Sequence, residues 1–367
     1  MSRRTERYLG VYFRLLALSA CLEQRAGQSL LSAYLSLVLG DGLYQVYRYS
    51  QNSWQMNDFR LEHRMQLKSY VKIIDAMNVA YLLTHLLMVS LALLWRHKER
   101  RLLAQLPALT ERTRPLINTN LHLVMECLVS GSAVMLCVLQ ANTYGLLLSN
   151  LRYIYCTQAV RARYLQMALL VERLDAQLLQ LQQQLAAANE QQQQQRCWRQ
   201  LRCKYAHIVK VSRQLSQLYG PALLWMNALC IGDFIVVCYV IIVLRELTEI
   251  DFSWLMLWQS IYVMLPTLMK IWTLCSTCNS CVRRTQRLLW QVNNASYLAT
   301  ARPGVVINAH LRSLCFDFTL QIMQSPLEFN ICSIYQLNLQ TLAGMFIFIV
   351  ESLVIFLQFV ALSKQTN

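Results

Sequence analysis

Long apolar stretches alternate with short basic segments along this chain. Seven of the apolar stretches reach or approach the roughly 20 residues that a helix needs to cross the hydrocarbon core of a membrane. We predict spans at residues 30–48, 71–95, 121–142, 144–168, 221–244, 253–274 and 338–362. Residues 40–42 (Gly-Asp-Gly) interrupt the first span, and Arg152, Arg161 and Arg163 lie within the fourth. The pattern predicts an all-α polytopic protein with one seven-helix membrane domain over residues 1–367.

Local signals refine three helix positions. Gly220-Pro221 fits a helix start for the fifth span, because proline is well tolerated in the first turn. Pro266 is expected to kink the sixth span. Residues 8–22 are expected to form an amphipathic helix at the cytoplasmic surface, and we find no cleavable signal peptide there.

The basic residues set the predicted orientation. With a cytoplasmic N-terminus, the inside segments 1–29, 96–120, 170–220 and 275–337 hold 23 of the 34 Lys and Arg residues, and the outside segments hold 7. Basic residues concentrate on the cytoplasmic side of membrane proteins. The N-terminus is therefore predicted inside, the C-terminus outside, and the sequon at Asn294 inside without a glycan. A G-protein-coupled receptor would have its N-terminus outside.

Composition excludes several function classes. The chain is 56% hydrophobic and 14% charged, whereas soluble domains carry about 25% charged residues. The net charge of +15 is divided among the gaps between spans, so we expect no nucleic-acid partner. The six histidines are dispersed, and we find no H-E-x-x-H, G-x-S-x-G or phosphate-loop motif. We expect no enzyme, no catalytic residue and no cofactor.

The segment CSTCNSC places Cys275, Cys278 and Cys281 just after the sixth span. They are small apolar packing residues, S-palmitoylation sites or part of a metal site. On a helix the three thiols would spread over about 120°, which makes a poor metal cage, so we predict no metal.

A heptad-like stripe continues from the fourth span into the cytoplasmic segment. Its residues recur at spacings of three and four, as in a coiled coil, and are Tyr164, Met167, Val171, Leu174, Leu178, Leu181 and Leu185. The stripe packs either on neighbouring helices of the same chain or on another subunit. Both alternatives predict a long cytoplasmic helix.

Several ionisable residues lie inside predicted spans, where they are costly and often functional. They are Asp75, His85, Glu126, Asp233 and Lys270. Asp75 lies near the outer boundary, where it can reach water. Asp233 lies deeper, and one interpretation is that it lines a wet cavity.

The C-terminal stretch ESLVIFLQF, residues 351–359, resembles the end of the last span in insect gustatory receptors. That family has Thr-Tyr, five hydrophobic residues and Gln-Phe; here Gln358 and Phe359 match, and Glu351-Ser352 replaces Thr-Tyr. The upstream segment 318–338 is also similar to the family's. The chain is thus identified as resembling the gustatory-receptor branch of the insect chemoreceptor superfamily.

The resemblance implies a tetrameric, ligand-gated, non-selective cation channel in the plasma membrane of chemosensory neurons. The last span would line the pore, and cytoplasmic helices would join the subunits. Gln358 and Phe359 inherit the pore-lining role, and Ile355 is assigned by its position one turn earlier. Glu351, Ile355, Gln358, Phe359 and Leu362 share an arc of about 100°. Glu351 either forms a carboxylate ring that favours cations, or pairs or lies buried within its own chain.

The sequence says less about the ligand-binding residues than about the pore. The outer halves of the spans offer six candidate ligand contacts: Tyr81, Gln140, Tyr144, Tyr239, Trp258 and Tyr262. The alternative is that these residues form the interfacial aromatic belt or pack in the core. A largely apolar lining favours a bitter-type tastant over a sugar. The alternative function is a seven-span chemoreceptor or co-receptor subunit that signals through a partner without its own pore. A transporter would show two related halves, and we find no such repeat.

Overall fold

The computed structural model describes residues 3–18, 25–55, 65–106, 117–140, 144–190, 195–247, 254–301 and 309–365. These residues form helices and one small hairpin. The helices are α1 (Arg3–Leu15), α2 (Arg25–Gln55), α3 (Met65–Leu94), α4 (Arg96–Gln105), α5 (Thr119–Gln140), α6 (Tyr144–Glu190), α7 (Gln195–Leu247), α8 (Trp254–Ala301), α9 (Ala309–Gln324) and α10 (Leu339–Gln365). The hairpin consists of β1 (Asn330–Ile331) and β2 (Tyr335–Gln336).

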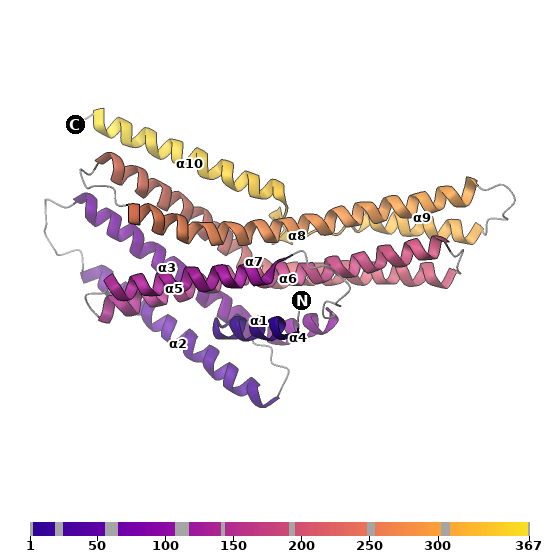
Figure 1. The fold of residues 1–367 in the computed structure, drawn as a ribbon, viewed down its shortest axis with the longest axis horizontal. Helices are drawn as coiled ribbons and strands as arrows, with labels where there is room; N and C mark the ends of the chain where they lie inside the picture. Colours follow the sequence, from indigo (N-terminus) through magenta and orange to yellow (C-terminus); the bar gives the residue numbers. More distant parts are fainter. Residues whose placement is uncertain are drawn as a thin grey trace.

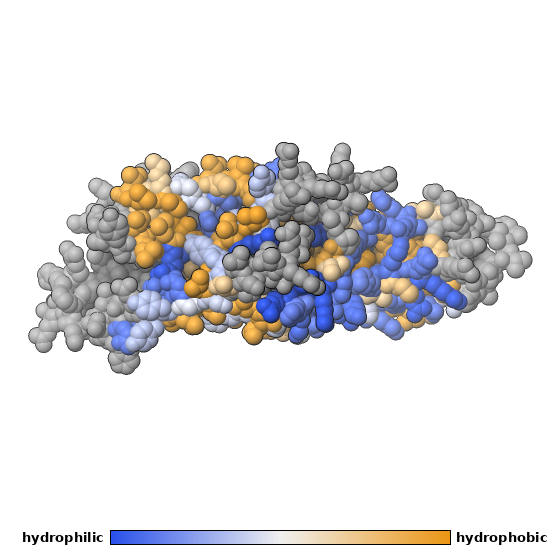
Figure 2. Space-filling view, turned by 90° about the horizontal axis from the view of Figure 1, so that it is seen from below, coloured by the Kyte–Doolittle hydropathy of each residue, from blue (hydrophilic) through white to orange (hydrophobic). Residues whose placement is uncertain are grey.

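The molecule is an elongated helical bundle with a broad half and a narrow half (Figure 1). Helices α6, α7 and α8 contain 47, 53 and 48 residues. At 1.5 Å per residue each is about 70–80 Å long, roughly twice the thickness of a hydrocarbon core. The broad half adds α2, α3, α5 and α10, and the narrow half adds α9. Hydrophilic side chains gather over the narrow half on the face shown in Figure 2.

All seven predicted spans fall almost entirely within helices, in α2, α3, α5, α6, α7, α8 and α10. Among the described residues, four stretches are long and apolar enough to cross a membrane, judged by length and composition. They are Ala76–Leu94, Thr119–Leu139, Cys197–Tyr239 and Leu339–Phe359. The all-helical prediction is confirmed, whereas the count of seven spans and the orientation stay predictions.

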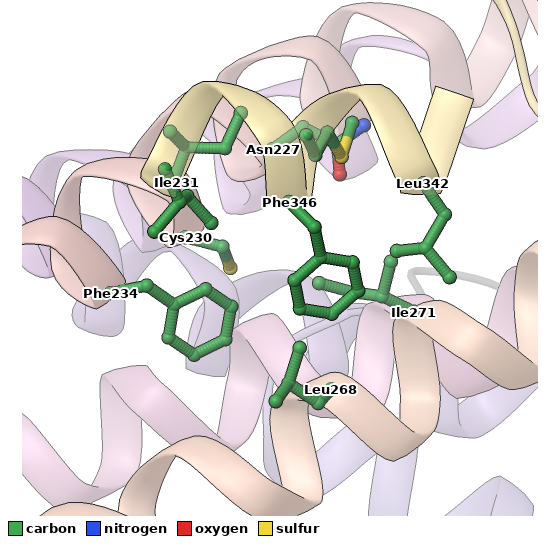
Figure 3. Close-up of a pocket in the computed structure, with 10 residues that line it drawn as sticks. Asn227, Cys230, Ile231, Phe234, Leu268, Ile271, Leu342 and Phe346 are labelled. Atoms are coloured by element: carbon green, nitrogen blue, oxygen red, sulfur yellow. The ribbon is translucent and has the colours of Figure 1, made fainter. Parts of the chain in front are cut away.

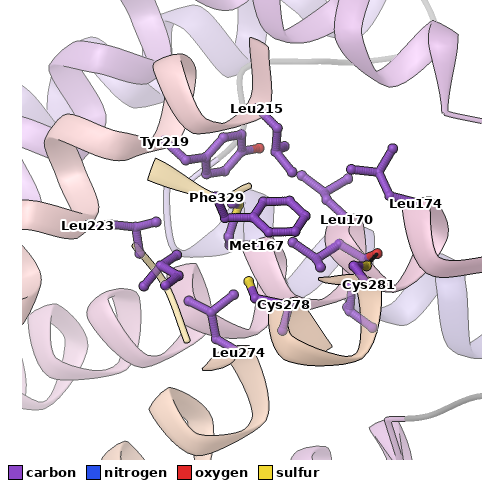
Figure 4. Packing of buried hydrophobic residues seen from close by; sticks show 14 of the residues in the cluster. Met167, Leu170, Leu174, Leu215, Tyr219, Leu223, Leu274, Cys278, Cys281 and Phe329 are labelled. Carbon is purple, nitrogen blue, oxygen red and sulfur yellow. Dashed lines mark hydrogen bonds between the residues drawn. The ribbon is translucent and has the colours of Figure 1, made fainter. Parts of the chain in front are cut away.

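The heptad-like stripe of α6 packs inside its own chain. All seven of its residues are at most 2% exposed. Figure 4 shows Met167 and Leu174 of α6 in the cluster with Leu215 of α7 and Cys278 of α8. The first alternative, packing on neighbouring helices, is therefore confirmed for these side chains, and they are not available to another subunit.

The three clustered cysteines belong to the same core. Cys275, Cys278 and Cys281 are at most 2% exposed, and the Cys281 thiol donates to the Val171 carbonyl at 3.6 Å. Burial raises the pKa of the Cys278 and Cys281 thiols well above the ordinary value. These cysteines act as small packing residues, and their burial keeps them from an acylating enzyme. The described part of the chain contains no metal-binding group of His, Cys, Asp or Glu.

The prediction of a helix start at Pro221 is wrong. Helix α7 begins at Gln195 and continues through Pro221. Tyr219 and Leu223 on either side are fully buried, so packing stabilises the helix despite the hydrogen bond that proline cannot make. A Cβ on Gly220 would lie 3.4 Å from the Cys332 amide nitrogen, so the glycine permits close approach of the hairpin.

Other local predictions differ in detail from the structure. Helix α1 covers Arg3–Leu15 rather than 8–22, and residues 19–22 lie outside the described residues. Its buried Leu9 and Phe13 belong to the main core. Helix α2 passes through residues 40–42 without a break. Pro266 lies inside α8, where the kink stays a prediction.

The hairpin reverses the chain and starts the last helix. Strands β1 and β2 are antiparallel, with Asn330 opposite Gln336. Cys332 and Ser333 have φ of 49° and 60°, as tight hairpin turns require. The Asn338 side chain then accepts a hydrogen bond from the Thr341 amide at 2.8 Å and caps α10.

Candidate functional site

Helix α10 lies at the edge of the bundle and packs mainly against α7 and α8 (Figure 1). Leu342 and Ile349 are buried on the packed side. Only 11% of Leu339–Phe359 is buried, compared with 44% of Ala76–Leu94 in α3. The most apolar stretch of the described chain therefore leaves most of its surface free for lipid or another subunit.

The four candidate pore residues all lie on the exposed part of α10. Ile355 is 51% exposed and Phe359 66%, and Glu351 and Gln358 are also exposed. Glu351 forms no ion pair within the described residues. Glu351 is thus exposed on the single subunit, and its pairing within an assembled protein stays a prediction.

A water-sized apolar cavity lies where α10 packs on α7 and α8 (Figure 3). Its volume of about 10 Å³ is too small for a ligand. The labelled side chains in Figure 3 show how the three helices meet there: Cys230 and Phe234 come from α7, Ile271 from α8, and Leu342 and Phe346 from α10. Movements of α7 or α8 would therefore reach α10 through direct side-chain contact.

A chain of hydrogen bonds passes through Asn227, which lines this cavity. The Tyr164 hydroxyl of α6 donates to Asn227 Oδ1 of α7 at 2.5 Å. Asn227 Nδ2 donates in turn to the Tyr335 hydroxyl of the hairpin. Three elements are thus joined close to the first turn of α10.

Charged side chains from three helices meet in the core of the broad half. Lys270 of α8 forms an ion pair with Glu126 of α5, and Arg161 Nη1 of α6 lies 4.0 Å from Glu126 Oε2. Arg161 Nε also donates to Thr267 Oγ1 of α8 at 3.1 Å. The three charged side chains are at most 4% exposed.

Asp233 of α7 extends this buried polar group. Its carboxylate accepts a hydrogen bond from the Tyr81 hydroxyl of α3 at 2.7 Å and lies within electrostatic range of Arg161. Asp233 is 6% exposed. Its interpretation as the lining of a wet cavity stays a prediction. With two acids and two bases, the group is formally neutral, as buried charges require.

His85 and Arg163 have local partners. His85 Nε2 lies 3.0 Å from the Leu16 carbonyl, and its ring packs edge-on against Tyr155. Arg163 lies 4.1 Å from the centre of the Tyr219 ring and donates to the Leu18 carbonyl at 2.9 Å. The Asp75 side chain lies outside the described residues.

The six candidate ligand contacts do not form a described pocket. Tyr81 is 1% exposed and its hydroxyl donates to Asp233, so Tyr81 lies in the core, and its assignment as a ligand contact stays a prediction. Tyr239 is half-buried and packs against Phe356 of α10, with ring centres 5.5 Å apart. The side chains of four candidates lie outside the described residues: Gln140, Tyr144, Trp258 and Tyr262.

The pairing of the charged core residues is not evident from the sequence. There Arg161 is only a charge within a predicted span, and Glu126 and Lys270 are separate ionisable residues in two other spans. The available signal was the presence of opposite charges in otherwise apolar stretches. Which charges meet depends on helix packing, which a single sequence does not show.

The long helices that run through both halves, the separate last helix and the four apolar stretches indicate a multi-helix membrane protein. Residues 6–362 match the family model described as 7tm chemosensory receptor, and the chain belongs to this family. It is 37% identical to gustatory receptor 9a of Drosophila melanogaster, over 99% of this chain and 100% of that protein.

Solved structures show the same fold. The olfactory receptor OR5 of the insect Machilis hrabei, in complex with eugenol, matches with a TM-score of 0.70. The match covers 97% of this chain and 98% of that chain at 12% identity. A second structure of the same receptor, whose description does not mention eugenol, matches with a TM-score of 0.69, also at 12% identity. At this identity the likeness concerns the fold. The resemblance to insect chemoreceptors is thereby confirmed.

Proposed function

We propose that this chain is a gustatory-receptor-like subunit of a tetrameric, ligand-gated, non-selective cation channel in which α10 lines the pore. The observation that carries the proposal is the exposed surface of α10, where Glu351 and Gln358 share a stripe with Ile355 and Phe359. Facing lipid, a carboxylate and an amide are costly. Facing a water-filled axis, they contact ions, and the apolar pair closes the pore by dewetting.

The ligand is proposed to be a small, bitter-type molecule. The similarity to a Drosophila gustatory receptor supports a tastant, and the eugenol complex of the structural relative supports a small organic ligand. Flux assays with alkaloids and sugars on cells that express the chain test this choice. Channel opening by sugars alone would contradict it.

Whole-cell recording tests the pore assignment, with the chain expressed alone and with related subunits. Ile355→Ala and Phe359→Ala are expected to cause constitutive current, and Gln358→Ala to shift the reversal potential under asymmetric ionic conditions. Leu357→Ala is the matched control, because Leu357 is exposed on the same helix but points about 160° away from Ile355.

Two results would contradict the assignment. Ligand-evoked current with unchanged permeation in all three variants would exclude α10 as the pore wall. Absence of current from surface-expressed protein, with every ligand and partner tested, would favour a receptor that signals through a partner.

A further inference from the structure

A cavity with several polar lining residues lies between α7 and α9 in the narrow half of the molecule. It has a volume of about 310 Å³ and is lined by Tyr205, Ala206, Val209, Lys210, Arg213, Gln214 and Gln217 of α7 and by Gln321 and Ser325 at the end of α9. None of the spans predicted from the sequence includes these residues, and neither the proposed pore nor the charged core uses them.

The cavity is positively charged. Lys210 and Arg213 line it, no carboxylate does, and neither cation has a hydrogen-bond or ion-pair partner among the described residues. Asp317, one turn before Gln321 on α9, already pairs with Arg202 at 3.3 Å. The cavity therefore offers two uncompensated cations to an anion.

Neutral polar groups line the rest of the cavity. Gln214 and Gln217 contribute amides from α7, and Gln321 contributes one from α9. Gln321 Oε1 accepts from Arg202 Nε at 2.8 Å, which leaves the Gln321 amino group as a donor toward other partners. The Tyr205 hydroxyl donates to the Ser325 carbonyl at 3.0 Å and ties the two helices together.

This combination of groups selects a chemical class. Arginine and lysine recognise phosphate oxygens, and arginine does so with two parallel donors. Amide side chains both donate to and accept from sugar-like hydroxyl groups. The polar contacts come from the two cations, the three glutamines, Tyr205 and Ser325, and the only aliphatic residues of the lining are Ala206 and Val209.

The position of the cavity along α7 indicates on which side of the membrane it lies. Arg213 lies eight residues before the predicted fifth span, about 12 Å along the helix. In the proposed orientation this places the cavity just inside the cytoplasmic surface. Anionic lipids concentrate there, and basic pockets on that side bind phosphorylated headgroups.

We propose that this cavity binds a phosphorylated polyol of the inositol phosphate class, either free in the cytoplasm or as the headgroup of an inner-leaflet lipid. Lys210 and Arg213 hold the phosphates, and the three glutamines hold ring hydroxyls. The proposal rests on the cytoplasmic placement of this part of α7 but not on channel activity.

Direct binding to the full-length chain in nanodiscs of neutral lipid tests the site. The probes are soluble inositol 1,4,5-trisphosphate and a short-chain phosphatidylinositol 4,5-bisphosphate. Lys210→Gln with Arg213→Gln is expected to weaken binding by about tenfold or more, because two charge-assisted hydrogen-bonding groups are lost. Lys204→Gln is the matched control. Lys204 lies exposed on the same helix, outside the cavity, with its ammonium 2.8 Å from Gln184.

The outcomes separate the sources and can overturn the proposal. Binding of both probes with the same dependence on the two cations supports a site for free and lipid-borne headgroups, and binding of the lipid probe alone supports a membrane headgroup. Equal weakening by Lys204→Gln would show diffuse surface attraction and overturn the site. Absence of binding of either probe to folded wild-type protein would also overturn it. Because the readout is binding, these outcomes do not depend on whether the chain conducts ions.

Discussion

At the scale of single residues, charge pairing is the main departure from an apolar membrane core. Glu126 bridges Lys270 and Arg161, and Asp233 takes a hydrogen bond from Tyr81. A buried charge without a partner is strongly destabilising, whereas a paired group is tolerated. The geometry indicates that these residues hold α5, α6 and α8 together rather than bind a ligand.

Removing the central acid is expected to destabilise the protein strongly. Glu126→Ala leaves two buried cations without their anion, which costs about 3–5 kcal/mol. The measurement is the thermal unfolding of purified protein in detergent. Asp41→Ala is the control, since Asp41 is 56% exposed in its pair with Arg152 and such pairs contribute about 0–1 kcal/mol. Similar unfolding temperatures for the two variants would contradict a structural role of the ion group.

At the scale of elements, two nearby glycines in α2 have opposite roles. Helix α2 passes through residues 40–42, although this segment interrupts the apolar pattern of the sequence. A Cβ on Gly42 would lie 2.3 Å from Leu86 Cδ2 of α3, whereas a Cβ on Gly40 would meet nothing within 4 Å. Gly42 thus permits close packing of α2 on α3, and Gly40 faces open space.

These two positions give a paired test of helix packing. Gly42→Ala is expected to destabilise the protein by about 1–3 kcal/mol, because Leu86 is buried and has little room to move. Gly40→Ala is expected to stabilise it by about 0.5–1 kcal/mol, because alanine favours the helix. The measurement is the unfolding temperature of each variant, compared with that of the wild-type protein. Equal effects of the same sign would refute the α2–α3 contact.

At the scale of the whole molecule, three helices connect the broad and narrow halves. Helices α6, α7 and α8 run through both, so a change in the broad half can reach the narrow half along rigid elements (Figure 1). The last helix joins this frame through the cavity region with α7 and α8 and through the Tyr164–Asn227–Tyr335 hydrogen bonds. This arrangement suits a receptor in which ligand binding moves α10.

The orientation prediction is made for the whole chain. An epitope tag at the N-terminus is expected to bind antibody only after the cells are permeabilised, and a tag at the C-terminus to bind on intact cells. The reason is the excess of basic residues in the predicted inside segments and the odd number of spans. Both tags on the same side would contradict seven spans, and an N-terminal tag accessible on intact cells would contradict the orientation.

The sequence by itself determined the helical membrane class, the segments that form the long helices and the exposed polar stripe of α10. These follow from hydrophobic periodicity, which acts locally along the chain. The sequence also predicted the heptad-like stripe from Tyr164 to Leu185, but it did not show whether this stripe packs on its own chain or on another subunit. The tertiary structure placed that partner in the same chain, because α7 and α8 cover the stripe completely.

The tertiary structure alone decided the pairings between distant residues. Gly220-Pro221 predicted a helix start, yet α7 continues through Pro221, because the residues on both sides of it are packed in the core. Tyr81 suited a ligand contact by its place in the sequence, but its hydroxyl is bonded to Asp233, 152 residues away. These side-chain contacts depend on which helices pack against each other and on how the helices are offset along their axes. The physical reason is that burial and charge compensation are properties of neighbours in space, which hydrophobic periodicity along one chain does not specify.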